Sequence, residues 1–67
     1  MKFKKWIELQ GGPKALARKL GTESPTVYAW LRGAASPKAL TMQKIVKMSR
    51  GALSYDDIID ATKGGAQ

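Results

Sequence analysis

Cysteine and histidine are both absent from this chain of 67 residues. Without cysteine there can be no disulfide and no thiolate ligand for a metal. Without histidine the chain lacks the commonest general base and the commonest metal ligand. The five acidic residues show no spacing typical of a catalytic pair. We therefore expect neither an enzyme nor a metal or cofactor site, and we expect no small-molecule ligand.

Long apolar runs are also absent. No stretch approaches the roughly 20 apolar residues of a membrane span, and the early lysines are not followed by the apolar centre of a signal peptide. The sequence therefore predicts a cytoplasmic protein. A chain this short has room for one domain with a modest core. We expect that domain over residues 1–62, followed by a flexible tail over residues 63–67.

Basic residues outnumber acidic ones by 12 to 5, which gives a net charge of +7. Residues 1–55 hold 11 basic and 2 acidic residues, whereas residues 56–67 hold 1 basic and 3 acidic residues. This asymmetry fits a polyanionic partner, with nucleic acid first and an anionic membrane surface second. The alternative is that the lysines only solubilise exposed helix faces.

Proline and glycine divide the chain into short helices, and no segment shows the alternation typical of a strand. Proline is tolerated in the first turn of a helix, serine can cap it, and glycine can end it. These signals predict an all-α fold of five short helices, over residues 1–10, 13–20, 24–32, 36–50 and 54–62.

Three serines are expected to cap helices. Ser24 and Ser36 each precede a proline, and Ser54 precedes Asp56 and Asp57, which suit the positive end of a helix dipole. The apolar residues expected to face the core recur at helical spacing: Phe3, Trp6, Ile7, Leu16, Ala17, Leu20, Val27, Trp30, Leu31, Leu40, Met42, Ile45, Val46, Met48, Leu53, Ile58 and Ile59. For Trp6 a contact between subunits is an equal alternative.

The pattern PKALARKLGTESPTVYAWLRG over residues 13–33 is the most informative part of the chain. Ala17 is small where a second helix would cross, and Gly21 suits the left-handed turn that follows. Val27 and Trp30 can then lock the second helix onto the first. This segment resembles the helix-turn-helix of the lambda-repressor and Cro-like family, also called the XRE family. Residues 6–60 look similar to a small phage or prophage Cro, and the helical pattern after residue 36 favours its all-helical branch.

The resemblance implies that residues 24–32 form a recognition helix in the DNA major groove. The positions that would face the bases are Glu23, Ser24, Pro25, Thr26, Tyr28, Ala29 and Arg32. The positions that would contact phosphates are Lys14, Arg18, Ser36 and Lys38. Ser24 and Pro25 also serve simply to open the helix, and a rotated helix would leave Tyr28 without a role in DNA binding.

The resemblance also implies a two-fold dimer on a pseudo-palindromic operator, with recognition helices about 34 Å apart. The dimer is expected to be weak and to form mainly on DNA. Candidates for its contact are Leu53, Tyr55, Ile58 and Ile59, with Met42 or Met48. Core packing is the competing explanation for these side chains.

The function expected is that of a sequence-specific transcriptional regulator that binds double-stranded DNA, most like a Cro-type phage repressor at the nucleoid of a bacterial host. An antitoxin-type DNA-binding autoregulator is an alternative, although the chain has little room for a toxin-binding surface. A basic helical protein-interaction module is a third hypothesis. Membrane-surface binding by KFKKWI ranks last, because this segment is short for interfacial anchoring.

Overall fold

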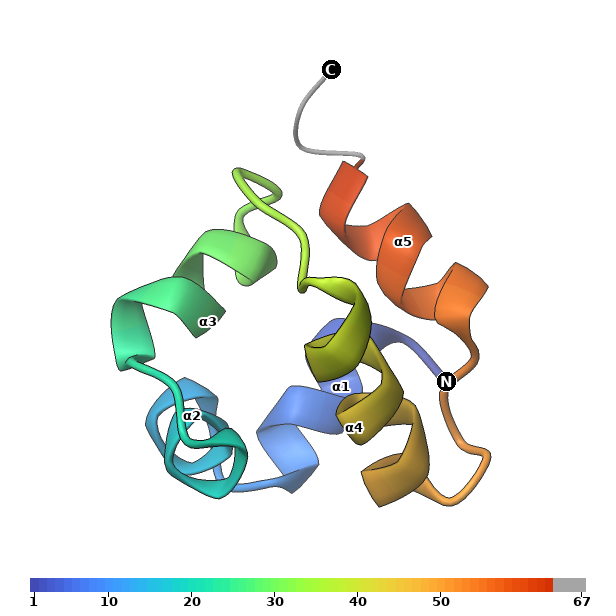
Figure 1. The fold of residues 1–67 in the computed structure, drawn as a ribbon, viewed down its shortest axis with the longest axis horizontal. Helices are drawn as coiled ribbons and strands as arrows, with labels where there is room; N and C mark the ends of the chain where they lie inside the picture. Colours follow the sequence, from blue (N-terminus) through green and yellow to red (C-terminus); the bar gives the residue numbers. More distant parts are fainter. Residues whose placement is uncertain (64–67) are drawn as a thin grey trace.

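The computed structural model describes residues 1–63, which form five α-helices and no strand. The helices are α1 (Phe3–Leu9), α2 (Pro13–Leu20), α3 (Ser24–Leu31), α4 (Ala39–Ser49) and α5 (Tyr55–Lys63) (Figure 1). The predicted all-α fold of five short helices is confirmed. Lys63 ends α5 instead of opening a tail, and the rest of the predicted tail lies outside the described residues.

The core lies where α1, α2, α3 and α5 meet, with α4 packed mainly against α2 and α5 (Figure 1). Phe3 is at its centre, because its ring stacks with Trp6 at a centroid distance of 6.4 Å and with Trp30 at 6.3 Å. Trp6 is 3% exposed, so it belongs to the core and cannot reach a second subunit. The aromatic cluster thereby joins α1 to α3, which are separated along the chain by α2.

Helix α4 buries fewer of its apolar residues than the sequence predicts. Ile45 is fully buried, but Leu40 is 74% exposed and Met48 is 37% exposed, so the prediction that both face the core is wrong. Leu40 precedes Ile45 by five residues, which rotates it about 140° around the helix. The buried face is completed by Ser49, whose hydroxyl donates to Val46 O and accepts from Leu53 N.

The predicted caps at Ser24 and Ser36 are wrong. Ser24 is the first residue of α3, after Glu23, and the α4 helix begins only after Lys38. Ser36 Oγ donates instead to Thr62 Oγ1 at 2.7 Å, and that buried hydroxyl donates to Ile58 O at 2.8 Å. This chain of hydrogen bonds fastens the α3–α4 connection to α5, so Ser36 is held by a residue far away in the sequence.

The turn between α2 and α3 is built on Gly21, as predicted. Its backbone is left-handed, with φ 72° and ψ 30°. The N–H groups of Gly21 and Thr22 donate to Arg18 O and Ala17 O, and these bonds satisfy carbonyls at the end of α2. The direction in which the chain enters α3 therefore depends on this one glycine.

Gly21→Ala is expected to lower the free energy of unfolding by about 1–2 kcal/mol, the cost of a left-handed conformation for a residue with a Cβ. An added Cβ would meet no atom within 4 Å, so the loss comes from the backbone alone. Urea denaturation measures it. Gly21→Asn is the matched control, and it should recover part of the loss because asparagine tolerates this conformation. Equal losses for both variants would contradict this explanation.

The start of α5 is a reciprocal capping box, which confirms the predicted cap at Ser54. Asp57 N donates to Ser54 Oγ at 3.1 Å, and Ser54 N donates to Asp57 Oδ2 at 2.9 Å. The backbone hydrogen bond from Ser54 holds the pKa of Asp57 below its ordinary value of 3.8. The positive charge of the N-terminus acts in the same direction, and partial desolvation opposes it.

Acid is expected to destabilise the protein partly through Asp57. Folding lowers the pKa of Asp57, so its carboxylate stabilises the folded state fully at any pH above the pKa that Asp57 has in the unfolded chain. This stabilisation is lost as the pH falls below about 4. Thermal denaturation of the wild type and of Asp57→Asn as a function of pH measures this effect. The Asp57→Asn variant should show the smaller loss of Tm on acidification, because it lacks the carboxylate that accepts from Ser54 N. Identical acid profiles for the two proteins would refute the assignment.

Candidate nucleic-acid interface

Helices α2 and α3 pack against each other more extensively than any other pair of helices among the described residues. Leu16, Ala17 and Leu20 are the buried residues of α2, and Val27 and Trp30 are those of α3. The turn at Gly21 joins the two helices, which lie together at one side of the molecule (Figure 1). The sequence identified the buried residues of this α2–turn–α3 unit correctly, and their packing against each other fixes which face of α3 points outward.

One face of α3 points away from the core. Pro25, Tyr28, Ala29 and Arg32 follow one another at helical spacing on this face, and the Tyr28 side chain is 44% exposed. Ala29 is half-buried, whereas Pro25 and Arg32 are exposed. The outer face therefore combines a phenol, a guanidinium and small apolar groups, which can serve hydrogen bonding as well as contact with a thymine methyl.

The remaining base-facing candidates lie at the N-terminal end of α3. Glu23 and Thr26 are exposed and Ser24 is half-buried. Thr26 is rotated about 100° from Pro25, and it lines a groove between α3 and α4 instead of the centre of the outer face. All seven candidates thus reach the surface. Four lie on the outer face of α3, Thr26 lines the groove, and Glu23 and Ser24 lie at the N-terminal end of the helix.

Exposed basic residues lie on α2 and directly before α4. Lys14 and Arg18 lie one turn apart on α2, and Lys38 immediately precedes α4. Lys19 has a different role, because its Nζ donates to Gln10 O and Gln10 Oε1 at the end of α1. Three of the four predicted phosphate contacts, Lys14, Arg18 and Lys38, are therefore exposed cations.

Ser36 differs from the other three predicted phosphate contacts. Its hydroxyl donates to Thr62, so the hydrogen that a phosphate oxygen would accept is already in use. It also lies three residues before α4, so it is not at the N-terminus of that helix. The sequence predicted a helix start at Ser36 because Ser-Pro is a common helix opening. In the structure Pro37 is buried and belongs to the non-helical connection before α4.

Two hydroxyl residues of the candidate interface were not predicted from the sequence. Thr22 and Thr41 line the same groove as Thr26 and Lys38, and the Trp30 ring forms part of its wall. These residues come from the turn, α3 and the first turn of α4. Their spacing along the chain does not predict that they share one groove. They do so because the α3–α4 connection and the start of α4 lie beside α3.

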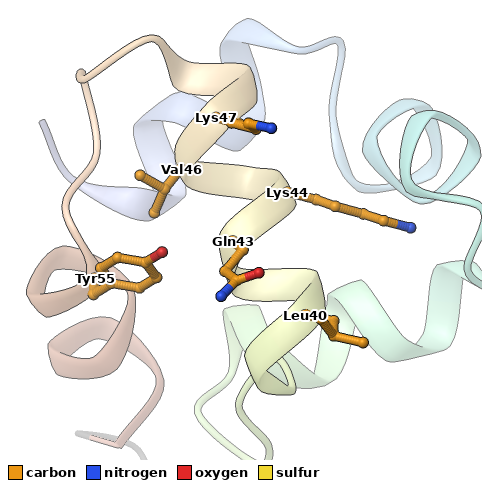
Figure 2. Close-up of a pocket in the computed structure, with 6 residues that line it drawn as sticks. All are labelled: Leu40, Gln43, Lys44, Val46, Lys47 and Tyr55. Atoms are coloured by element: carbon orange, nitrogen blue, oxygen red, sulfur yellow. The ribbon is translucent and has the colours of Figure 1, made fainter.

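Of the four residues predicted to form the dimer contact, two are buried in the core and two are exposed. Leu53 is 1% exposed and Ile58 is 0% exposed, so both belong to the core and the prediction that they contact a second subunit is wrong. Tyr55 and Ile59 are exposed to 46% and 39%. Tyr55 borders a second groove, shown in Figure 2, together with Leu40, Gln43, Lys44, Val46 and Lys47.

Within residues 1–63, no helix is long and apolar enough to cross a membrane. The same part of the chain holds no cluster of three or more acidic side chains that could bind a metal ion. No family model, no curated protein and no solved structure matches the chain. The function must therefore be inferred from the residues and their geometry.

Proposed function

We propose that the protein is a sequence-specific transcriptional regulator that binds double-stranded DNA, similar to a Cro-type repressor of the lambda-repressor and Cro-like family. The observation that carries this proposal is the placement of α3: buried Val27 and Trp30 hold the helix against α2, and its opposite face stays exposed. Exposed cations lie on the neighbouring segments, on α2 and directly before α4. A single α-helix fits the major groove, where each base pair presents its own pattern of donors, acceptors and methyl groups.

In this function α3 lies in the major groove with its N-terminal end toward the bases. Tyr28 can hydrogen-bond to a base edge, Ala29 and Pro25 can contact thymine methyl groups, and Arg32 can reach guanine or a phosphate. Glu23 can accept from a cytosine amino group and disfavours other bases. This set of residues predicts selectivity among base pairs.

Phosphate contacts orient the protein without reading sequence. Lys14 and Lys38 lie at the starts of α2 and α4, where free backbone N–H groups favour an anion, and Arg18 lies one turn along α2 from Lys14. The groove with Thr22, Thr26 and Thr41 adds hydroxyl donors beside Lys38. Two such subunits would bind the two halves of a pseudo-palindromic operator, with their α3 helices about 34 Å apart.

Selection of bound sequences from a random duplex pool, followed by titrations of the winner at several salt concentrations, tests this function. We expect a pseudo-palindrome to be enriched. If each subunit neutralises about four phosphates, the slope of log affinity against log salt should be near −7 for the pair. Failure to enrich any sequence, together with loss of binding at physiological salt, would contradict the proposal and favour a protein-interaction module.

A further inference from the structure

A groove along α4 combines apolar side chains with charge of one sign. Figure 2 shows Val46 and the Tyr55 ring on one side of this groove, whereas Lys44 and Lys47 extend toward the other side. Leu40 is 74% exposed and Tyr55 is 46% exposed, so the fold leaves much of this apolar surface uncovered. We call the groove lined by these five residues and by Gln43 the α4–α5 groove.

The charge of the α4–α5 groove is positive. Among the described residues, none that lines it is acidic, and α4 contains no acidic residue over Ala39–Ser49. Lys44 and Lys47 are three positions apart, so they are neighbours on the helix surface. The groove beside α1 is different, because Lys2 and Lys4 line it together with Asp57 and Asp60.

Two possible occupants fit this groove poorly. A DNA duplex presents phosphates and sugars on its outside, which would satisfy the lysines but would leave Leu40 and Tyr55 uncovered. A second copy of the chain, related by a two-fold axis through the groove, uses the same surface on both sides. Such a contact would bring four lysines into one interface, where like charges repel. The groove therefore favours an occupant that supplies carboxylates and apolar side chains together.

We propose that the α4–α5 groove binds an acidic amphipathic helix of a partner protein. The described chain has no strand edge that an extended peptide could join, so a helix lying in the groove is the available mode. Its apolar face covers Leu40, Val46 and Tyr55, and its glutamates or aspartates meet Lys44 and Lys47. Leu40 and Val46 lie about 9 Å apart along the axis of α4, which is close to two turns of the partner helix.

This surface is separate from the candidate nucleic-acid interface. No residue of the α4–α5 groove is a predicted base or phosphate contact, and none lines the groove that contains Thr22 and Thr41. The interaction therefore goes beyond the proposed function and does not depend on it. Exposed ion pairs each contribute little to affinity and the groove is short, so we expect a dissociation constant in the micromolar range or weaker.

Titration of the isotope-labelled full chain with a synthetic peptide, followed by nuclear magnetic resonance, tests this proposal. The probe is an amphipathic helix of about four turns, with leucines on one face and glutamates beside them. Backbone signals of Gln43, Lys44 and Tyr55 should shift as the peptide is added. A peptide with lysine in place of every glutamate, and another with serine in place of every leucine, should each bind about tenfold more weakly or worse.

Variants of the chain locate the contact. Lys44→Glu/Lys47→Glu should weaken binding of the acidic peptide about tenfold or more, because each change replaces an attraction by a repulsion. Lys4→Glu/Lys5→Glu is the matched control, since it has the same net charge but alters exposed residues of α1. It should bind the peptide within about threefold of the wild type, because distant exposed charges are screened by salt.

The apolar part of the groove has its own pair of variants. Leu40→Ser should weaken peptide binding about fivefold or more, because a large exposed apolar contact is lost. Leu9→Ser is the control, because Leu9 is also highly exposed but lies at the end of α1. Circular dichroism melting shows whether each variant folds as the wild type does.

Several outcomes would overturn the proposal. Equal weakening by the two lysine variants would show only a general attraction between a basic protein and an acidic peptide. Signals that shift with duplex DNA but not with the peptide would assign the groove to nucleic acid. Signals that change with protein concentration alone, together with pairing in sedimentation equilibrium, would assign it to a second copy. The absence of any shift at Gln43, Lys44 and Tyr55 would leave the groove without this partner.

Discussion

Trp30→Ala is expected to unfold a measurable fraction of the protein at room temperature. The Trp30 ring is 3% exposed and stacks with Phe3 at 6.3 Å, so its removal opens a cavity between α1 and α3. Truncating a buried aromatic side chain costs about 3–5 kcal/mol, and a domain of this size has a total stability near the lower end of about 5–15 kcal/mol. Most of the stability would be lost.

Far-ultraviolet circular dichroism during urea denaturation measures this effect. Leu9→Ala is the control, because Leu9 is 60% exposed and its truncation removes no core contact. That variant should have the midpoint of the wild type. A Trp30→Ala protein that remained fully helical, with nearly the midpoint of the wild type, would show that the aromatic cluster does not hold α3 in place.

Tyr28→Ala and Lys38→Ala are expected to weaken DNA binding in different ways. Removing the Tyr28 ring should relax the preference at one or two positions in each half-site, by about 1–3 kcal/mol per base pair. Removing the Lys38 charge should weaken binding to all sequences alike and reduce the salt slope by about 1 for each subunit. The difference follows from their positions, since Tyr28 lies on the outer face of α3 and Lys38 before α4.

Titrations against the selected operator and its single-base variants, at several salt concentrations, distinguish these effects. Lys5→Ala is the control for charge, because Lys5 is exposed on α1, away from the α2–turn–α3 unit. It should leave base preference unchanged and alter the slope less than Lys38→Ala does. If Tyr28→Ala weakened all sequences equally, α3 would be rotated from the orientation proposed here.

Local signals were sufficient to predict the helices. Pro13 begins α2 and Gly21 ends it in a left-handed conformation, while Ser54 and Asp57 open α5 as a capping box. Each of these features involves residues a few positions apart, within reach of one helical turn. Helical spacing likewise identified most of the core, including Phe3 and Trp30, because only one stripe of a helix can face inward.

The outer residues of α3 were predictable for the same reason. Once Val27 and Trp30 are buried, the geometry of the helix turns Tyr28 and Arg32 outward. Helical spacing therefore predicts that these side chains are exposed. Their contact with DNA bases remains a proposal.

The amino-acid sequence alone thus determined the number and approximate bounds of the helices, the left-handed turn at Gly21 and the inner stripe of each helix. Tertiary packing alone decided that Ser36 bonds to Thr62, 26 residues away, and that Leu40 faces outward. It also decided that Leu53 and Ile58 are core residues and that Thr22 and Thr41 share a groove. The division has a physical reason: caps and helical spacing act between neighbours in the chain, whereas these contacts join segments whose approach depends on how all five helices fill one core.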